Sequence, residues 1–258
     1  MRDFSPSAGR TVANSNRRGQ FRILLAVAVA IAGAPHSYAD SIVVLPSGLA
    51  PGSEYRLVFV TDGTYTATSA NINDYNAEVA ADANSVPVLA DLATTWDVLG
   101  ATPAESAMNN IAVVGGASIP IYNLAGQLVA SGDDTTGIFA GNGIGAPIDI
   151  APAGANFRSG VLVFTGTTEA GGSNPCCSLG GVESNIVVGD TAVSNLNWIV
   201  IGIEPPQYSY YLYGISGVLT AQGSSTPEPT TAGMAGLSMA IASLAIWWSN
   251  RFQRTDHH

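Results

Sequence analysis

Glu54-Tyr-Arg-Leu-Val-Phe-Val60 is the stretch of this sequence that predicts secondary structure most clearly. β-Branched and aromatic residues fill it, and such a run is typical of a strand buried in a core. Asp62-Gly63 follows and predicts the turn that ends the strand. We therefore expect a buried strand over residues 54–60.

The segments after this strand predict helices as well as further strands. A helix is expected over residues 71–84, because Ile72, Tyr75, Val79 and Ala83 recur there at spacings of three and four. Its other face would carry Asp74, Glu78 and Asp82, either as a solvated stripe or as a row of metal ligands. A short helix is expected over residues 103–110. Further strands are expected over residues 94–99, 119–124, 127–130, 160–166, 197–203 and 208–220, the second and third forming a hairpin.

Length and composition predict one folded domain with an apolar segment at each end. The chain has 258 residues, of which 47% are hydrophobic and 11% charged. Its 29 glycines suit short strands joined by turns. We expect a single α+β, β-rich domain over residues 40–221, with one or two short helices.

The charge of this domain excludes one class of partner. Between Asp40 and Ser225 the only cations are Arg56 and Arg158, against 16 carboxylates, which gives a net charge near −14. Nucleic-acid binding needs a basic patch that displaces counterions from phosphates, so we expect none. An acidic surface is compatible with neutral glycans, with divalent cations or simply with solubility.

The distribution of histidine and lysine excludes most hydrolytic mechanisms. The three histidines are His36, His257 and His258, and the chain has no lysine. The domain therefore lacks the residues for catalytic triads that use histidine, for zinc sites that use histidine and for Schiff-base chemistry. We expect a noncatalytic protein that needs no resident cofactor.

The first 39 residues have the organisation of an export signal. A leader with Arg17, Arg18 and Arg22 precedes the apolar run 23–34, and small residues precede Asp40. This order is the one that signal peptidase recognises, and it predicts a signal helix over residues 1–39 with cleavage between Ala39 and Asp40. We therefore expect export from the cytoplasm.

The last 37 residues predict a second membrane segment. Residues 222–231 form a Pro/Ser/Thr linker, residues 232–249 are apolar enough to span a hydrocarbon core, and residues 250–258 are basic and polar. Arginine at positions 251 and 254 would keep this end in the cytoplasm. A membrane-spanning helix with the folded domain outside the cell follows.

This tail resembles the PEP-CTERM sorting signal. The resemblance rests on Pro227-Glu228-Pro229, the single spanning segment after it and the short basic end. It implies recognition and cleavage by an exosortase-type membrane peptidase, in bacteria that make extracellular polysaccharide. The protein would be anchored in the membrane before processing and would then lie at the cell surface or outside the cell. The alternative is a plain C-terminal anchor with a Pro-rich stalk.

The domain itself is distantly similar to bacterial C-type-lectin-like modules related to endostatin. The matching segments are residues 57–61, 95–99, 119–129, 163–167 and 212–219. The resemblance implies a C-type-lectin-like fold. Where a calcium-dependent lectin has Glu-Pro-Asn, however, this chain has Glu204-Pro205-Pro206.

Two loops contain residues capable of specific chemistry. Cys176 and Cys177 are adjacent, and in an oxidising compartment they could form a bridge to each other, pair across two chains or stay as free thiols. Asp133 and Asp134 lie in a glycine-rich loop and could begin a calcium shell, although a solvent-exposed turn would have the same composition. A calcium-dependent adhesin is one alternative function.

Aromatic and acidic residues suggest how a sugar could be bound or cleaved. Strand alternation places Tyr211 and Tyr213 on one face and Tyr208 and Tyr210 on the other, where the second pair could stack on sugar rings. Pairs among Asp62, Asp97, Asp133 and Asp134 would allow a carboxylate-dependent glycosidase. The function we expect is an exported surface or matrix protein that binds polysaccharide or other envelope components.

Overall fold

The computed structural model describes residues 41–112 and 118–222. The predicted signal peptide and cleavage site, the sorting motif, the spanning segment and the basic tail lie outside these residues. Within the described ranges, no helix has the length and apolar character that crossing a membrane requires.

The described residues form two sheets with a few short helices, which confirms the α+β, β-rich prediction. In chain order the elements are β1 Glu54–Val60, α1 Ile72–Asn84, α2 Pro87–Ala90, β2 Trp96–Val98, α3 Ala107–Asn110, β3 Ile121–Asn123, β4 Leu128–Ala130, β5 Leu162–Phe164, β6 Ile186–Asp190, the 3₁₀ helix η1 Leu196–Trp198, β7 Gly202–Glu204, β8 Tyr213–Ser216 and β9 Leu219–Thr220.

Strand β1 is the centre of the larger sheet, whose order is β2-β8-β1-β3-β4, with β9 also pairing to β1. It runs parallel to β3 and antiparallel to β8 and β9. Leu57 and Phe59 pack into one apolar cluster, and Val58 and Val60 pack into a second on the opposite face. A strand covered on both faces needs apolar residues at successive positions, which is why its sequence predicted it so clearly.

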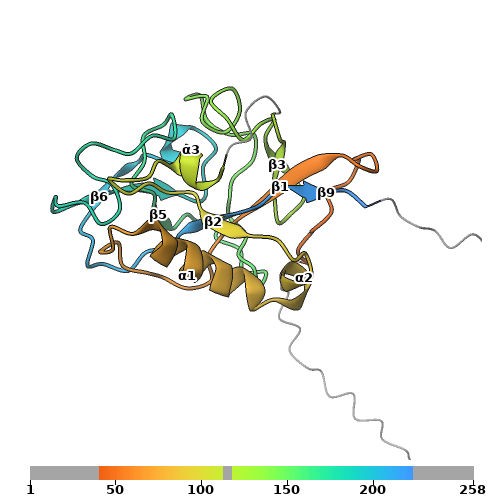
Figure 1. The fold of residues 1–258 in the computed structure, drawn as a ribbon, viewed down its shortest axis with the longest axis horizontal. Coiled ribbons are helices and arrows are strands. Elements are labelled where there is room, and N and C mark those ends of the chain that lie inside the picture. Colours follow the sequence, from red (N-terminus) through yellow and green to blue (C-terminus); the bar gives the residue numbers. More distant parts are fainter. Residues whose placement is uncertain (1–40, 113–117, 223–258) are drawn as a thin grey trace, which may run out of the picture. The chain divides into compact units, whose positions relative to one another are not determined.

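Helix α1 covers the first of these clusters with Tyr75, Val79 and Ala83, and α2 follows it along the same side of the molecule (Figure 1). The side chain of Asn71 accepts a hydrogen bond from Asn73 N and caps the start of α1. The predicted helix is therefore present within one residue of its expected bounds. The short helix α2 was not predicted.

The smaller sheet is antiparallel, in the order β5-β6-β7. It is linked to the larger sheet through Tyr211, which precedes β8 and pairs with Val163 of β5. Strand β6 was not among the predicted strands. Its β-branched run Ile186-Val-Val is the signal that could have found it.

The prediction of a buried strand over residues 197–203 was wrong. Residues 196–198 form η1, because the side chain of Asn195 accepts a hydrogen bond from Asn197 N and starts a helical turn. The Trp198 ring then enters the second core cluster. Only Gly202–Glu204 pairs as a strand, and Ile203 there is 53% exposed.

Several predicted elements are present but shorter than expected. The hairpin predicted over residues 119–130 is β3 with β4, and the helix predicted over residues 103–110 is reduced to α3. Segment 208–220 divides into isolated bridges, β8 and β9. In each case the local pattern located the element, and pairing with distant residues set its ends.

Candidate functional site

Two tyrosines that are far apart in the sequence form a hydrogen-bonded pair. Tyr65 N donates to Tyr210 O at 2.7 Å, and Tyr210 N donates to Tyr65 O at 3.1 Å. Residues that exchange both backbone hydrogen bonds in an antiparallel bridge carry their side chains on the same face. The two side chains therefore leave the backbone on the same face.

Each of these tyrosines has a carboxylate near its phenol group. Tyr65 Oη donates to Asp82 Oδ1 on α1 at 2.9 Å. Glu204, at the end of β7, places its negative charge near Tyr210. Burial and then the bonded carboxylate raise the pKa of Tyr65 well above its usual value. For Tyr210, burial and then the nearby charge of Glu204 raise the pKa. Both hydroxyls therefore stay protonated, and the bond to Asp82 holds the Tyr65 ring in place.

Tyr208 packs against Tyr210 and is exposed to solvent. Its side chain is 51% exposed, and its ring meets that of Tyr210 edge-on, with centroids 6.4 Å apart. Tyr210 in turn packs edge-on against Phe164 of β5, with centroids 5.0 Å apart. We call the face made by Tyr65, Tyr208 and Tyr210, together with Asp82 and Glu204, the tyrosine surface.

Strand alternation had predicted this division of the tyrosines. Tyr213 lies in the second core cluster and Tyr211 packs against it, whereas Tyr210 packs against the first cluster. Tyr65 and the two carboxylates were not predicted as part of the site. The only local signal for Asp82 was its place in the acidic row of the helix.

Further acids surround one end of the tyrosine surface. Asp82 Oδ2 accepts hydrogen bonds from the backbone N–H groups of Asp62 and Gly63, at 2.7 and 3.2 Å, and so holds the turn after β1 against α1. Burial, and then the nearby charges of Asp74 and Asp82, raise the pKa of Glu78. The acids predicted on α1 therefore influence one another through their charges. Asp82 is the one whose hydrogen bonds also hold a neighbouring turn in place.

The acid pair in the glycine-rich loop has a different role from the one predicted. Asp133 is fully buried, and its Oδ2 lies 3.0 Å from Arg56 Nε of β1. These two atoms lack the alignment of a hydrogen bond, so the pair is held by charge attraction. The guanidinium also donates through Nη1 to Ser216 O at 3.0 Å. Asp133 thus neutralises a buried cation in the centre of the sheet.

Its neighbour Asp134 lies in an exposed turn and is hydrogen-bonded within that turn. Its Oδ1 accepts hydrogen bonds from Thr136 N and Thr136 Oγ1, at 2.8 and 2.7 Å, and these bonds lower its pKa. Among the described residues, no group of three His, Cys, Asp or Glu side chains could hold a metal ion. The guanidinium that neutralises Asp133 weighs against a calcium site at Asp133 and Asp134, which stays a hypothesis.

The same geometry weighs against the predicted acid pairs of a glycosidase. A buried Asp133 beside a guanidinium is out of reach of a substrate. Burial raises the pKa of Asp97 on β2, and Arg56 partly offsets this shift. Asp62 accepts a hydrogen bond from Ala153 N at 2.9 Å and lies near Asp82. Of the four predicted acids, Asp97 and Asp133 share Arg56, whereas Asp62 and Asp134 have separate surroundings.

Cys176 and Cys177 are joined by a disulfide, the first of the three alternatives left open by the sequence. Asn174 Oδ1 accepts hydrogen bonds from the N–H groups of both cysteines at 3.2 Å, and Val187 N donates to Cys177 O at 2.8 Å. A bridge between neighbours closes so short a loop that its chain-entropy term is only about 1 kcal/mol, against about 3 kcal/mol for fifteen residues. The hydrogen bonds already hold the loop, so the bridge adds little to folding.

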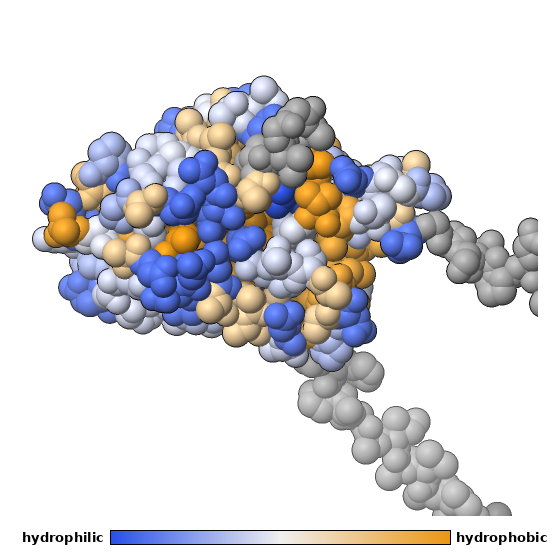
Figure 2. Space-filling model, viewed as in Figure 1, coloured by the Kyte–Doolittle hydropathy of each residue, from blue (hydrophilic) through white to orange (hydrophobic). Residues whose placement is uncertain are grey.

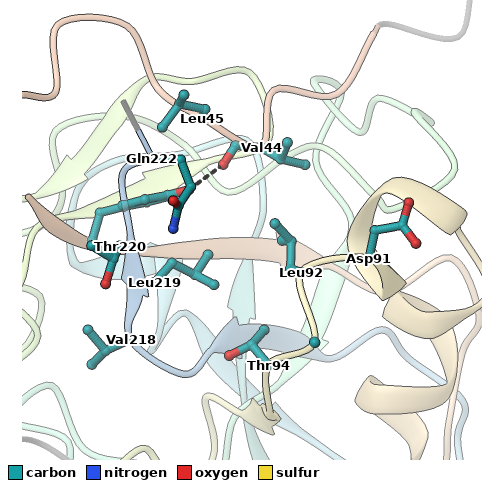
Figure 3. Close-up of a pocket in the computed structure, with 11 residues that line it drawn as sticks. Val44, Leu45, Asp91, Leu92, Thr94, Val218, Leu219, Thr220 and Gln222 are labelled. Atoms are coloured by element: carbon teal, nitrogen blue, oxygen red, sulfur yellow. Dashed lines mark hydrogen bonds between the residues drawn. The ribbon is translucent and has the colours of Figure 1, made fainter. Parts of the chain in front are cut away.

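A further hollow, of about 490 Å³, has both polar and apolar residues in its lining (Figure 3). Its walls include Val44, Leu45, Leu92 and Leu219, and Tyr55 Oη donates to Val44 O beside it at 2.7 Å. Figure 2 shows the apolar side chains that gather here, between α2 and the β1–β9 strands. Its lining also contains the polar residues Asp91, Thr94, Thr220 and Gln222, and Tyr55 is its one aromatic residue.

No protein-family model matches the chain, and no curated protein has a significantly similar sequence. The function therefore has to be argued from the residues themselves.

Proposed function

We propose that this chain is an exported cell-surface or extracellular-matrix protein whose folded domain binds neutral polysaccharide through the tyrosine surface. The observation that carries the proposal is the Tyr65–Tyr210 pair. It places two tyrosines on one face, with the Tyr65 hydroxyl bonded to Asp82 and the charge of Glu204 near Tyr210, and Tyr208 extends this face into solvent. Aromatic faces suit the apolar C–H surfaces of sugar rings, and carboxylate oxygens accept hydrogen bonds from sugar hydroxyls.

The charge of the domain selects neutral polymers over acidic ones. The nearest carboxylates are Asp82 and Glu204 within the tyrosine surface, with Glu78 and Asp62 beyond it. Of the two arginines in the domain, Arg56 is buried against Asp133, and Arg158 lies 3.9 Å from a carboxylate oxygen of Asp149. A polymer of uronic acids would meet net repulsion here.

The first test removes the most exposed ring. We expect Tyr208→Ala to weaken binding of a neutral glucan up to about tenfold, because an aromatic contact is worth about 0.5–1.5 kcal/mol. Tyr208→Phe keeps the ring and should bind as the wild type does. Affinity would be measured by retardation in gels that contain dextran, β-glucan or alginate. Equal binding by Tyr208→Ala and the wild type, or a preference for alginate, would refute the proposed surface.

The fold and the sorting route complete the proposal. The domain has a C-type-lectin-like arrangement, and the tail carries a PEP-CTERM signal that an exosortase-type peptidase cleaves after signal peptidase has removed residues 1–39. The order of strand, helix and hairpin along the chain supports the C-type-lectin-like arrangement. The motif Pro227-Glu228-Pro229 supports the sorting signal.

Sorting can be tested separately from binding. In a host that has an exosortase, mass spectrometry of the surface-exposed protein should give an N-terminus at Asp40 and a C-terminus near the Pro-Glu-Pro motif. Glu228→Ala should leave the full tail in the membrane fraction. A mature protein that keeps residues 230–258 in that host would rule out the sorting route and leave a plain membrane anchor.

A further inference from the structure

A small pocket of about 230 Å³ lies beside the disulfide. Its apolar lining comes from Pro103, Pro175, Val182 and the sulfur-bearing side chain of Cys176. Val182 is fully exposed and Cys176 is exposed, whereas Cys177 is 6% exposed. The disulfide ring is therefore anchored on its Cys177 side and open to the pocket on its Cys176 side.

Two polar groups in this pocket are available to a ligand. Ser178 lines the pocket and is only 4% exposed, yet its hydroxyl bonds to no group in the part of the chain that the structure describes. Asn174 uses its Oδ1 for the two cysteine N–H groups, which leaves its Nδ2 donor without a partner among residues 41–112 and 118–222. Both groups therefore have hydrogen-bonding capacity left for a ligand in the pocket.

The disulfide is better explained by this pocket than by folding. The loop is already held by hydrogen bonds from Asn174, from Val187 N to Cys177 O and from Leu179 N to Ala101 O at 2.8 Å. A bond between adjacent residues restricts the unfolded chain little. It does create a rigid, apolar, sulfur-lined ring at the surface.

We propose that this pocket binds one neutral sugar ring, with the Cys176–Cys177 disulfide as the platform beneath its apolar face. The hydroxyl of Ser178 and the Nδ2 donor of Asn174 bond to its hydroxyl groups. Pockets for drug-sized molecules take about 300–1,000 Å³, so this smaller volume suits a single ring. Glu183 is the one charged residue of the lining, and it disfavours acidic sugars.

The chain allows a direct test, because Cys176 and Cys177 are its only cysteines. A ring seated on the disulfide covers it, so methyl glucoside, methyl galactoside or methyl mannoside should slow its reduction by a phosphine several-fold and saturably. The full chain in detergent would be treated with the phosphine, and new thiols counted by alkylation and mass spectrometry. Glucuronic acid should give no protection. Absence of protection by all three hexosides would overturn the proposal.

Three variants separate ligand binding from structural effects. Ser178→Ala should abolish protection without changing the reduction rate in the absence of sugar, because its hydroxyl holds no part of the fold. Gly181→Ala should also reduce protection, since its Cβ would lie 3.0 Å from Ser178 O and crowd the pocket. Tyr208→Ala should keep full protection, which makes this pocket independent of the tyrosine surface. Protection retained by Ser178→Ala would contradict the assignment.

Discussion

Replacing Asp133 by alanine is expected to destabilise the domain by about 3–5 kcal/mol, because removing one partner of a buried ion pair leaves the other charge uncompensated. The charge left behind is that of Arg56, whose side chain is 3% exposed at the centre of the larger sheet. Domains of this kind have a total stability of about 5–15 kcal/mol, so much of the population could unfold. Urea denaturation followed by tryptophan fluorescence would measure the loss.

The adjacent acid provides a matched control. Asp134→Ala removes the same charge from an exposed turn and should cost no more than about 1 kcal/mol. The double variant Arg56→Met with Asp133→Leu should recover part of the loss, because replacing both charges leaves no buried ion. Equal losses of stability for Asp133→Ala and Asp134→Ala would show that the buried ion pair contributes no more than an exposed carboxylate does.

Replacing Gly189 by alanine is expected to cost at least about 2 kcal/mol, because extra atoms in a close-packed interior force strain on their neighbours. A Cβ at this position in β6 would overlap the backbone carbonyl of Trp198 and lie 3.0 Å from the Cα of Ile199. Backbone atoms cannot rotate aside as a side chain can. The Trp198 carbonyl also accepts a hydrogen bond from Tyr213 Oη at 3.2 Å, so its displacement would disturb the second core cluster.

The neighbouring strand contains the control for this variant. Gly202 of β7 is exposed, and a Cβ there would meet nothing within 4 Å. Gly202→Ala should be neutral or stabilise the domain by up to about 1 kcal/mol, because alanine restricts the unfolded chain more than glycine does. The melting temperature of Gly189→Ala should therefore fall, whereas that of Gly202→Ala should rise or stay unchanged. A fall of equal size in both would point to a general intolerance of substitution in this sheet.

Residues 197–203 show where local patterns mislead. Trp198-Ile-Val-Ile201 has the composition of a strand, but a side-chain cap from Asn195 and a place for the Trp198 ring in the core turn it into a helical turn. Gly189 permits that turn to approach β6. The last two conditions cannot be recognised within the segment itself, because each depends on a partner that folding brings to it.

The sequence by itself determined the elements and properties that depend on near neighbours or on composition. The buried strand over residues 54–60, the helix after Asn71, the division of the tyrosines between two faces, and an acidic domain without histidine or lysine all follow from it. Only the tertiary structure decided that Asp133 neutralises Arg56 and that Tyr65 stands beside Tyr210. Periodicity and capping act over a few residues, whereas the burial of a charge or the pairing of two distant tyrosines depends on how distant segments pack together.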